Sequence, residues 1–96
     1  RTDLLDLNEL PFPARHLVDM TRYEHIIGEG LQFFTIQATR GCPAACTFCD
    51  IRKTKFRERT PKNVVAEIEQ LVEMGVDDLF FVDDTITINI GFVKVY

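Results

Sequence analysis

The stretch TRGCPAACTFCDIRK, Thr39 to Lys53, holds all three cysteines of this 96-residue chain within one short loop. It follows LQFFTIQA, Leu31 to Ala38, a run rich in aromatic and β-branched residues that is bounded by glycine and by the Gly-Cys-Pro turn. Such a run predicts a buried strand. The cysteine loop is therefore expected to leave the C-terminal end of a strand.

A helix is predicted after the loop. Thr60 stands before Pro61, which places an N-cap residue ahead of proline in the first helical position. Apolar residues then recur on one helical face until Gly75 supplies a stop. These apolar residues are Val64, Val65, Ile68, Leu71 and Val72.

The segment DDLFFVDD, Asp77 to Asp84, predicts a second short strand that two acids close. Strand, loop, helix and strand make a βαβ unit, whose crossover connection leaves the two strands parallel. The predicted fold class is therefore α/β. The cysteine loop, Asp83 and Asp84 then face the same edge of the sheet, which is where α/β proteins build their sites.

The two ends of the chain carry weaker signals. Residues 1–30 hold prolines in LPFPARHLVD, scattered acids and two glycines, and they predict a linker or lead-in with one or two short helical turns. Residues 31–96 would form the domain itself. The last stretch, IGFVKVY, is rich in β-branched and aromatic residues and contains a glycine, so it has a low helix propensity.

Composition points to a soluble globular protein, with 46% hydrophobic and 27% charged residues. No apolar run approaches the roughly 18 residues that span a bilayer, and the first residues lack the order of a secretion signal. We therefore expect a cytoplasmic protein without a membrane span.

The net charge of −4 is unevenly distributed. Between Arg40 and Lys62 seven basic and two acidic residues give a local balance of +5, so the rest of the chain carries −9. A solvated basic loop is the simplest interpretation. The alternatives are an anionic partner, such as nucleic acid or a phosphorylated substrate, and a field that favours thiolates.

The three cysteines admit several interpretations. They could be reduced thiols without a special role, whereas a disulfide framework fails on their odd number and on the expected compartment. A structural zinc site needs a fourth ligand, and the two imidazoles, His16 and His25, both lie upstream. An iron–sulfur cluster takes thiolate ligands, and three of them leave one iron of a four-iron cluster open to an outside molecule. A metal-binding or electron-transfer module thus stands beside an enzyme as an alternative.

GCPAACTFCD resembles the cluster motif of the radical S-adenosylmethionine (SAM) superfamily, C-x3-C-x-aromatic-C, with Phe48 at the aromatic position. Further segments resemble the branch whose enzymes carry a cobalamin-binding domain ahead of the radical domain. These segments are DLNELPFPARHLVDM, ATRGCPAACTFC, RERTPKNVVAEIEQL and LFFVDDT. The resemblance covers about Asp6 to Asn89. It implies that residues 31–96 are the N-terminal βαβ part of a partial (β/α)6 TIM-like barrel, the radical SAM core domain.

The resemblance also implies roles for particular residues. Cys42, Cys46 and Cys49 would each bind one iron of a 4Fe-4S cluster, and the amino and carboxylate groups of SAM would chelate the fourth iron. Phe48 would lie near the adenine of SAM.

An acidic residue at the end of the second strand would receive the methionine amino group of SAM. The family commonly has Gly-Gly-Glu there, whereas this chain has Val82, Asp83 and Asp84. Asp84 is the first candidate and Asp83 the second. Alternatively, both acids only end the strand or cap the turn that follows.

The implied activity is reductive cleavage of SAM to methionine and a 5'-deoxyadenosyl radical, which abstracts hydrogen from a substrate. The branch suggests a cobalamin-dependent methyltransferase or cyclase acting on a cofactor-like, lipid or tetrapyrrole molecule. Cobalamin would come from a domain not in this chain, and the electron from a donor such as flavodoxin or ferredoxin. The chain alone is expected to be inactive. A tRNA methylthiotransferase is a further alternative, since it shares the loop and would suit its basic flank.

Overall fold

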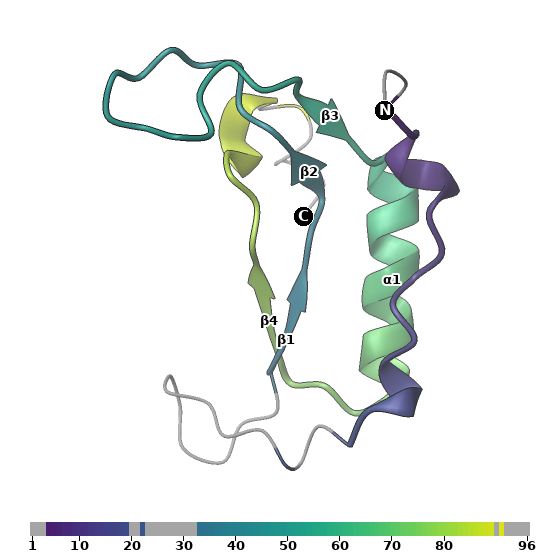
Figure 1. Cartoon of the computed structure of the whole chain (residues 1–96). Helices are drawn as coiled ribbons and strands as arrows, with labels where there is room; N and C mark the ends of the chain where they lie inside the picture. Colours follow the sequence, from purple (N-terminus) through teal and green to yellow (C-terminus); the bar gives the residue numbers. More distant parts are fainter. Residues whose placement is uncertain (1–3, 20–21, 23–32, 90, 92–96) are drawn as a thin grey trace.

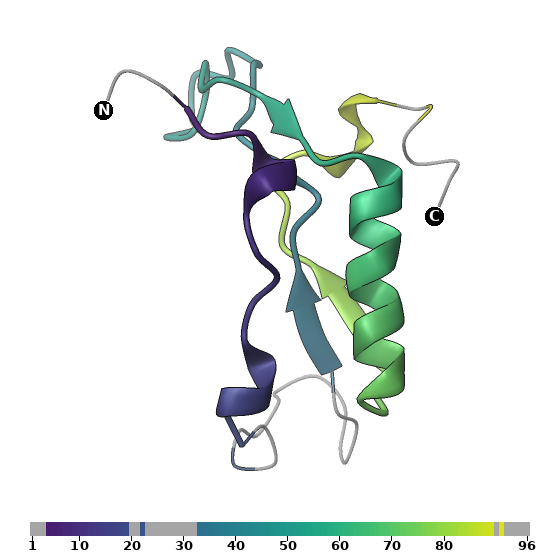
Figure 2. The same ribbon diagram turned by 90° about the vertical axis from the view of Figure 1, so that its right-hand side faces the viewer.

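A parallel pair of strands and one helix form the frame of the structure, a computed structural model that describes residues 4–19, 22, 33–89 and 91 (Figure 1). β1 (Phe33–Ile36) lies directly beside β4 (Asp78–Phe81), in a register that pairs Phe33 with Asp78 and Ile36 with Phe81. α1 (Pro61–Glu73) connects the two strands across one face of the pair (Figure 2). The predicted α/β class and the parallel βαβ arrangement are confirmed, while the partial (β/α)6 barrel stays a prediction.

Both ends of α1 lie where the sequence predicts them. The Thr60 hydroxyl accepts a hydrogen bond from the backbone N–H of Asn63 at 3.3 Å, and Pro61 occupies the first helical position. At the other end Gly75 adopts a φ of +81°, in the left-handed region where glycine is strongly preferred. The predicted helix is confirmed.

The buried face of α1 differs from the prediction at one position. Val64 and Leu71 are fully buried, but Val72 is 62% exposed. One residue turns an α-helix by about 100°, so Val72 faces solvent when its neighbour Leu71 faces the core. Glu67, which lies three residues beyond Val64, takes a place on the buried face instead.

The core lies between α1 and the strand pair. Ile36, Ala38 and Val64 form its buried centre. Further apolar side chains, partly buried, surround it: Ile68, Phe81 and Ile86. Ala38 has no exposed surface, so the core reaches beyond the end of β1 to the start of the cysteine loop.

The N-terminal segment, residues 4–19, lies on the same side of the strand pair as α1 (Figure 1). It contains two short helical turns, η1 (Leu7–Glu9) and η2 (Arg15–Leu17), as the sequence predicts. Leu7 is buried, and the Asn8 side chain accepts a hydrogen bond at 2.7 Å from the backbone of Thr60, where α1 begins. The proposed boundary at residue 30 lies outside the described residues, as does most of IGFVKVY, so these assignments stay predictions.

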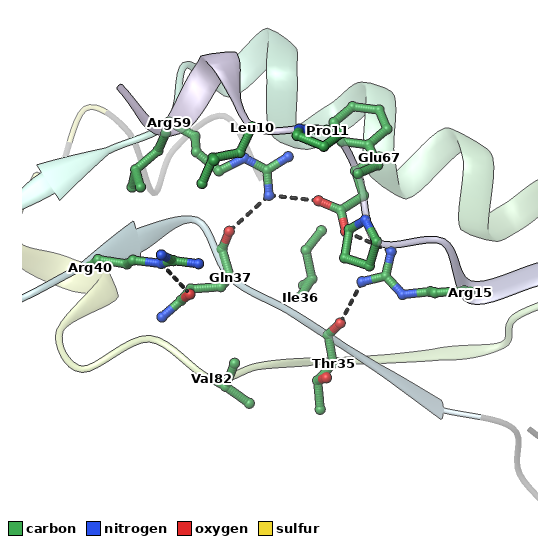
Figure 3. A pocket seen from close by; sticks show the side chains of 13 residues that line it. Leu10, Pro11, Arg15, Thr35, Ile36, Gln37, Arg40, Arg59, Glu67 and Val82 are labelled. Carbon is green, nitrogen blue, oxygen red and sulfur yellow. Dashed lines mark hydrogen bonds and ion pairs between the residues drawn. The ribbon is translucent and has the colours of Figure 1, made fainter. Parts of the chain in front are cut away.

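A buried charge cluster joins this segment to α1 (Figure 3). The Glu67 side chain is only 2% exposed and lies between two guanidinium groups. Arg15 Nη1 is 2.7 Å from Glu67 Oε1, and Arg59 Nη1 donates to Glu67 Oε2 at 2.6 Å. We call these three residues the arginine clamp.

The arginine clamp also covers one edge of β1. Arg15 donates to the carbonyl oxygen of Thr35 and Arg59 to that of Gln37, both at 2.8 Å. Ile36, between them, turns its carbonyl the other way, toward the β4 side, where the backbone of Val82 donates to it. Guanidinium groups therefore stand on the side of β1 where a further strand would bond.

The N-terminal segment also borders a cavity of about 340 Å³ beside the arginine clamp. Leu10 and Pro11 line this cavity together with the three residues of the clamp (Figure 3). No helix in the described ranges has the length and apolar character needed to cross a membrane.

We expect Glu67→Gln to destabilise the chain by about 3 kcal/mol, because it leaves two buried guanidinium groups without a counter-charge. Urea denaturation measures the change. Glu69→Gln, at an exposed position of the same helix, is the matched control and should change stability by less than about 0.5 kcal/mol. Equal unfolding midpoints for the two variants would show that the arginine clamp does not contribute to the stability of the chain.

Candidate functional site

The cysteine loop is closed at its base by a second, smaller sheet. β2 (Thr39–Arg40) follows β1 and pairs antiparallel with β3 (Arg57–Glu58). This pairing brings the two ends of residues 41–56 together at the C-terminal edge of the parallel strands (Figure 1). The sequence analysis did not predict this sheet, because strands of two residues are too short to show an alternating pattern.

Within the loop, Cys42 is held by backbone contacts. Its N–H donates to the Thr54 hydroxyl at 2.8 Å, and its carbonyl accepts from the Thr54 N–H at 3.0 Å. The preceding Gly41 has a φ of +85°, and a Cβ there would collide with the carbonyl of Lys55. Only glycine fits at that position, which explains the glycine of the Gly-Cys-Pro turn.

The three thiols differ in their surroundings. Cys42 is buried, Cys46 is exposed, Cys49 is half-buried, and all three are free of disulfide bonds. Cys42 Sγ accepts a hydrogen bond from the Thr85 hydroxyl at 3.3 Å. Among residues 4–19, 22, 33–89 and 91, no three His, Cys, Asp or Glu side chains converge closely enough to hold a metal ion. The three thiols thus lie on one loop, but their sulfur atoms are not close enough together to bind one metal ion.

The donor set fits an iron–sulfur cluster by its chemistry. Clusters are bound by thiolates, and this loop offers three free thiols, two of them accessible from solvent. His16 offers no fourth ligand for zinc: it lies beside Gln70 and Glu73, near the C-terminal end of α1 and at the opposite end of the sheet from the loop (Figure 1). His25 is outside the described residues.

The two acids after β4 meet the start of the loop, as predicted, but in different ways. The Asp83 carboxylate accepts hydrogen bonds from the backbone N–H groups of Ala38 and Thr39 and, at 2.7 Å, from the Thr39 hydroxyl. Among the residues that the structure describes, Asp84 accepts a hydrogen bond only from the N–H of Gly41, at 3.2 Å, and its side chain is exposed. Asp83 is therefore engaged within the chain, whereas Asp84 keeps its carboxylate accessible.

Phe48 and the basic residues complete the surface of the loop. Phe48 is 90% exposed, and Arg52, Lys53 and Lys55 are exposed on the same loop. Arg59 belongs instead to the arginine clamp. Arg57 is half-buried and donates to the carbonyl oxygen of Leu5. The basic run therefore contains both solvent-exposed residues and residues that hold the chain together, a difference that a count of charges does not reveal.

The family follows from a comparison with known proteins. Residues 36–96 match the Radical SAM superfamily, which is more than half of the chain. The chain belongs to the radical SAM superfamily. The match begins within β1 and includes the cysteine loop, so the family predicted from the cysteine motif is confirmed.

Curated relatives of this radical SAM chain include two methylating enzymes and one methylthiolating enzyme. It is 34% identical over 86 residues to the hopanoid C-2 methylase of Rhodopseudomonas palustris (85% of this chain, 15% of the relative). It is 35% identical over 92 residues to the cytidylyl-2-hydroxyethylphosphonate methyltransferase of Streptomyces wedmorensis (85% and 17%). It is 31% identical over 88 residues to the tRNA-2-methylthio-N(6)-dimethylallyladenosine synthase of Moorella thermoacetica (74% and 20%).

The radical SAM chain thus spans a fifth or less of the length of these relatives. No solved structure matches it. The methylases support the branch predicted from the flanking segments, in which a cobalamin-binding domain accompanies the radical domain.

We expect Asp83→Asn to destabilise the chain by about 2 kcal/mol, since hydrogen bonds to an ionised carboxylate are worth more than those to a neutral amide. Asp84→Asn is the control, with an expected change within about 0.5 kcal/mol, because its single bond lies at an exposed site. Denaturant unfolding measures both, and hydrogen exchange at Ala38 and Thr39 should be faster in Asp83→Asn alone. Equal exchange rates in the two variants would contradict the assignment.

Proposed function

We propose that this chain is the part of a radical SAM enzyme that binds a 4Fe-4S cluster through Cys42, Cys46 and Cys49 and holds SAM beside it. The observation that carries the proposal is the gathering of three free thiols on a loop fixed at the C-terminal edge of the parallel strands, in a chain of this superfamily. When bound, the cluster supplies the electron that splits SAM into methionine and a 5'-deoxyadenosyl radical.

The three cysteines would contribute differently to binding. Cys42 is already fixed by Thr54 on its backbone and by Thr85 on its sulfur. Cys46 and Cys49 lie on the outer part of the loop and are more exposed, so they would move toward Cys42 as the metal is taken up. Ordering of the loop would thus accompany loading, since metal binding and folding of the ligand loop are coupled.

Asp84 is the residue we propose for the methionine amino group of SAM. Its carboxylate is exposed at the edge where the loop begins, and it makes one long hydrogen bond that an ammonium group could replace. Asp83 would support this edge from within, because its oxygens already accept from Ala38 and Thr39. Phe48 would offer its exposed ring to the adenine, as aromatic faces stack on planar bases.

We propose methyl transfer as the reaction of the whole enzyme, with cobalamin bound by a separate domain. Cyclisation of the substrate is the alternative reaction within the same branch. The similarity to two methylases, each 34–35% identical over an alignment that covers 85% of this chain, supports the proposal. The substrate would be a small molecule of cofactor, lipid or tetrapyrrole character. A cytoplasmic one-electron donor such as flavodoxin or ferredoxin would reduce the cluster, and the exposed Arg52, Lys53 and Lys55 would attract an acidic donor.

Methylthiolation of tRNA is a second candidate. It is favoured by the similarity to a tRNA-2-methylthio-N(6)-dimethylallyladenosine synthase and by the exposed basic residues of the loop, which suit a phosphate backbone. Retention of tRNA by the chain, with an affinity that falls steeply as salt rises, would favour this candidate over methyl transfer.

Anaerobic reconstitution with iron and sulfide should give a brown protein with about four irons per chain. Cys46→Ser should abolish cluster formation, because two thiolates hold the cluster too weakly. Thr47→Ser, at the next position of the loop, should load like the wild type. Iron analysis and the visible absorption spectrum measure the outcome, and full iron in Cys46→Ser would refute the cluster assignment.

SAM should alter the electron paramagnetic resonance (EPR) spectrum of the reduced, reconstituted protein. Asp84→Asn should raise the SAM concentration needed for this change by about tenfold or more, because it removes a charged hydrogen bond worth roughly 1.5–3 kcal/mol. Asp50→Asn removes an exposed carboxylate from the cysteine loop itself and is the control. Equal SAM dependence in both variants would assign the amino group to another residue.

A further inference from the structure

We propose that Thr85 is a positioning residue that donates a hydrogen bond to the sulfur of Cys42 and so sets the reduction potential of the cluster this thiol binds. The inference rests on the proposed function, because it requires that Cys42 is a cluster ligand. It assigns a role to a residue that the cysteine motif does not include.

The geometry places a hydroxyl donor against one particular thiol. Thr85 Oγ1 lies 3.3 Å from Cys42 Sγ, within the range of a hydrogen bond to sulfur. Thr85 is also the N-cap residue of η4 (Ile86–Ile88), a position whose side chain usually caps the helix, yet it makes no such bond. Its hydroxyl oxygen therefore accepts no hydrogen bond from the start of η4, and its hydroxyl proton is donated to the sulfur of Cys42.

The contact is held from both sides. Three consecutive residues after β4 meet the segment after β1 in order: Asp83 binds Ala38 and Thr39, Asp84 binds Gly41, and Thr85 reaches Cys42. Beyond the ends of β1 and β4, side chains of the second segment thus bond to residues of the first in the same parallel order. Cys42 itself is fixed on its backbone by Thr54. Cys42 therefore cannot move away from Thr85 without breaking its hydrogen bonds to Thr54, and Asp83 keeps the segment before Thr85 beside the start of the loop.

Ligation fixes the direction of this hydrogen bond. A metal-binding cysteine is a thiolate, which has no proton to donate, so the hydroxyl must be the donor. Reduction of a cluster adds negative charge that its sulfur ligands share. A donor on one of those sulfurs stabilises the reduced form more than the oxidised form and raises the reduction potential.

Burial makes Cys42 the thiol for which such a donor matters most. Cys42 is 9% exposed, whereas Cys46 is open to solvent, where water can donate to the sulfur. A buried sulfur that gains negative charge is destabilised unless a hydrogen-bond donor stabilises that charge. Thr85 is this donor for Cys42, whereas water can donate to the exposed Cys46.

The test compares Thr85→Val, which keeps the shape and removes the hydroxyl, with Thr85→Ser, which restores it. Thr87→Val, at an exposed position of η4, is the matched control. Each protein is reconstituted anaerobically with iron and sulfide and titrated with redox mediators, while the EPR signal of the reduced cluster reports the midpoint potential. Electron–nuclear double resonance after transfer into D₂O detects an exchangeable deuteron near the cluster.

We expect a more negative midpoint potential and one exchangeable deuteron fewer in Thr85→Val, with wild-type values in Thr85→Ser and Thr87→Val. Loss of the cluster from Thr85→Val but not from Thr85→Ser would equally assign the hydroxyl to Cys42. An unchanged potential and deuteron signal in a loaded Thr85→Val refutes the inference and leaves the proposed function intact. Failure of the wild-type chain to form a cluster refutes the proposed function itself.

Discussion

Two strands of four residues end side by side, and the carboxylate of Asp83 joins them beyond the point where their backbone pairing stops. The N–H groups of Ala38 and Thr39 would otherwise lack a partner where β1 turns into the loop, and buried backbone donors without partners are costly. One ionised side chain therefore fixes where the loop departs. Gly41 and Cys42 thereby come to lie beside Asp84 and Thr85, the residues that follow Asp83 in the chain.

The molecule places its two charged centres at different locations and uses them differently. The arginine clamp lies in the interior beside α1, where Glu67 neutralises one of two guanidinium charges. The carbonyl oxygens of Thr35 and Gln37 accept further hydrogen bonds from the two guanidinium groups. The acids after β4 lie at the rim, where one is engaged and the other is accessible. Glu67 and Asp83 thus both hold distant segments together, whereas Asp84 leaves most of its carboxylate exposed to solvent.

The sequence predicted the elements with strong local signals. Thr60 and Pro61 mark the start of α1, Gly75 marks its end, and the apolar runs locate both strands. The cysteine spacing and Phe48 led to the family, which residues 36–96 confirm. Local chemistry decides all of these features, so a single sequence was enough.

The features that the sequence did not predict depend on contacts between distant segments. In the sequence Glu67 is an ordinary polar residue of a helix. Its burial depends on ion pairs with Arg15 and Arg59, which lie outside the helix. The pairing of β2 with β3 closes a loop without leaving a pattern in either strand. Similarly, Asp83 and Asp84 are adjacent and chemically identical, and only the location of residues 38–41 distinguishes their roles.

The guanidinium groups on the outer carbonyls of Thr35 and Gln37 have an architectural consequence. A further strand could bond to this side of β1 only by displacing both guanidinium groups, which would leave Glu67 buried without its two partners. Addition of a strand at the β4 side carries no such cost.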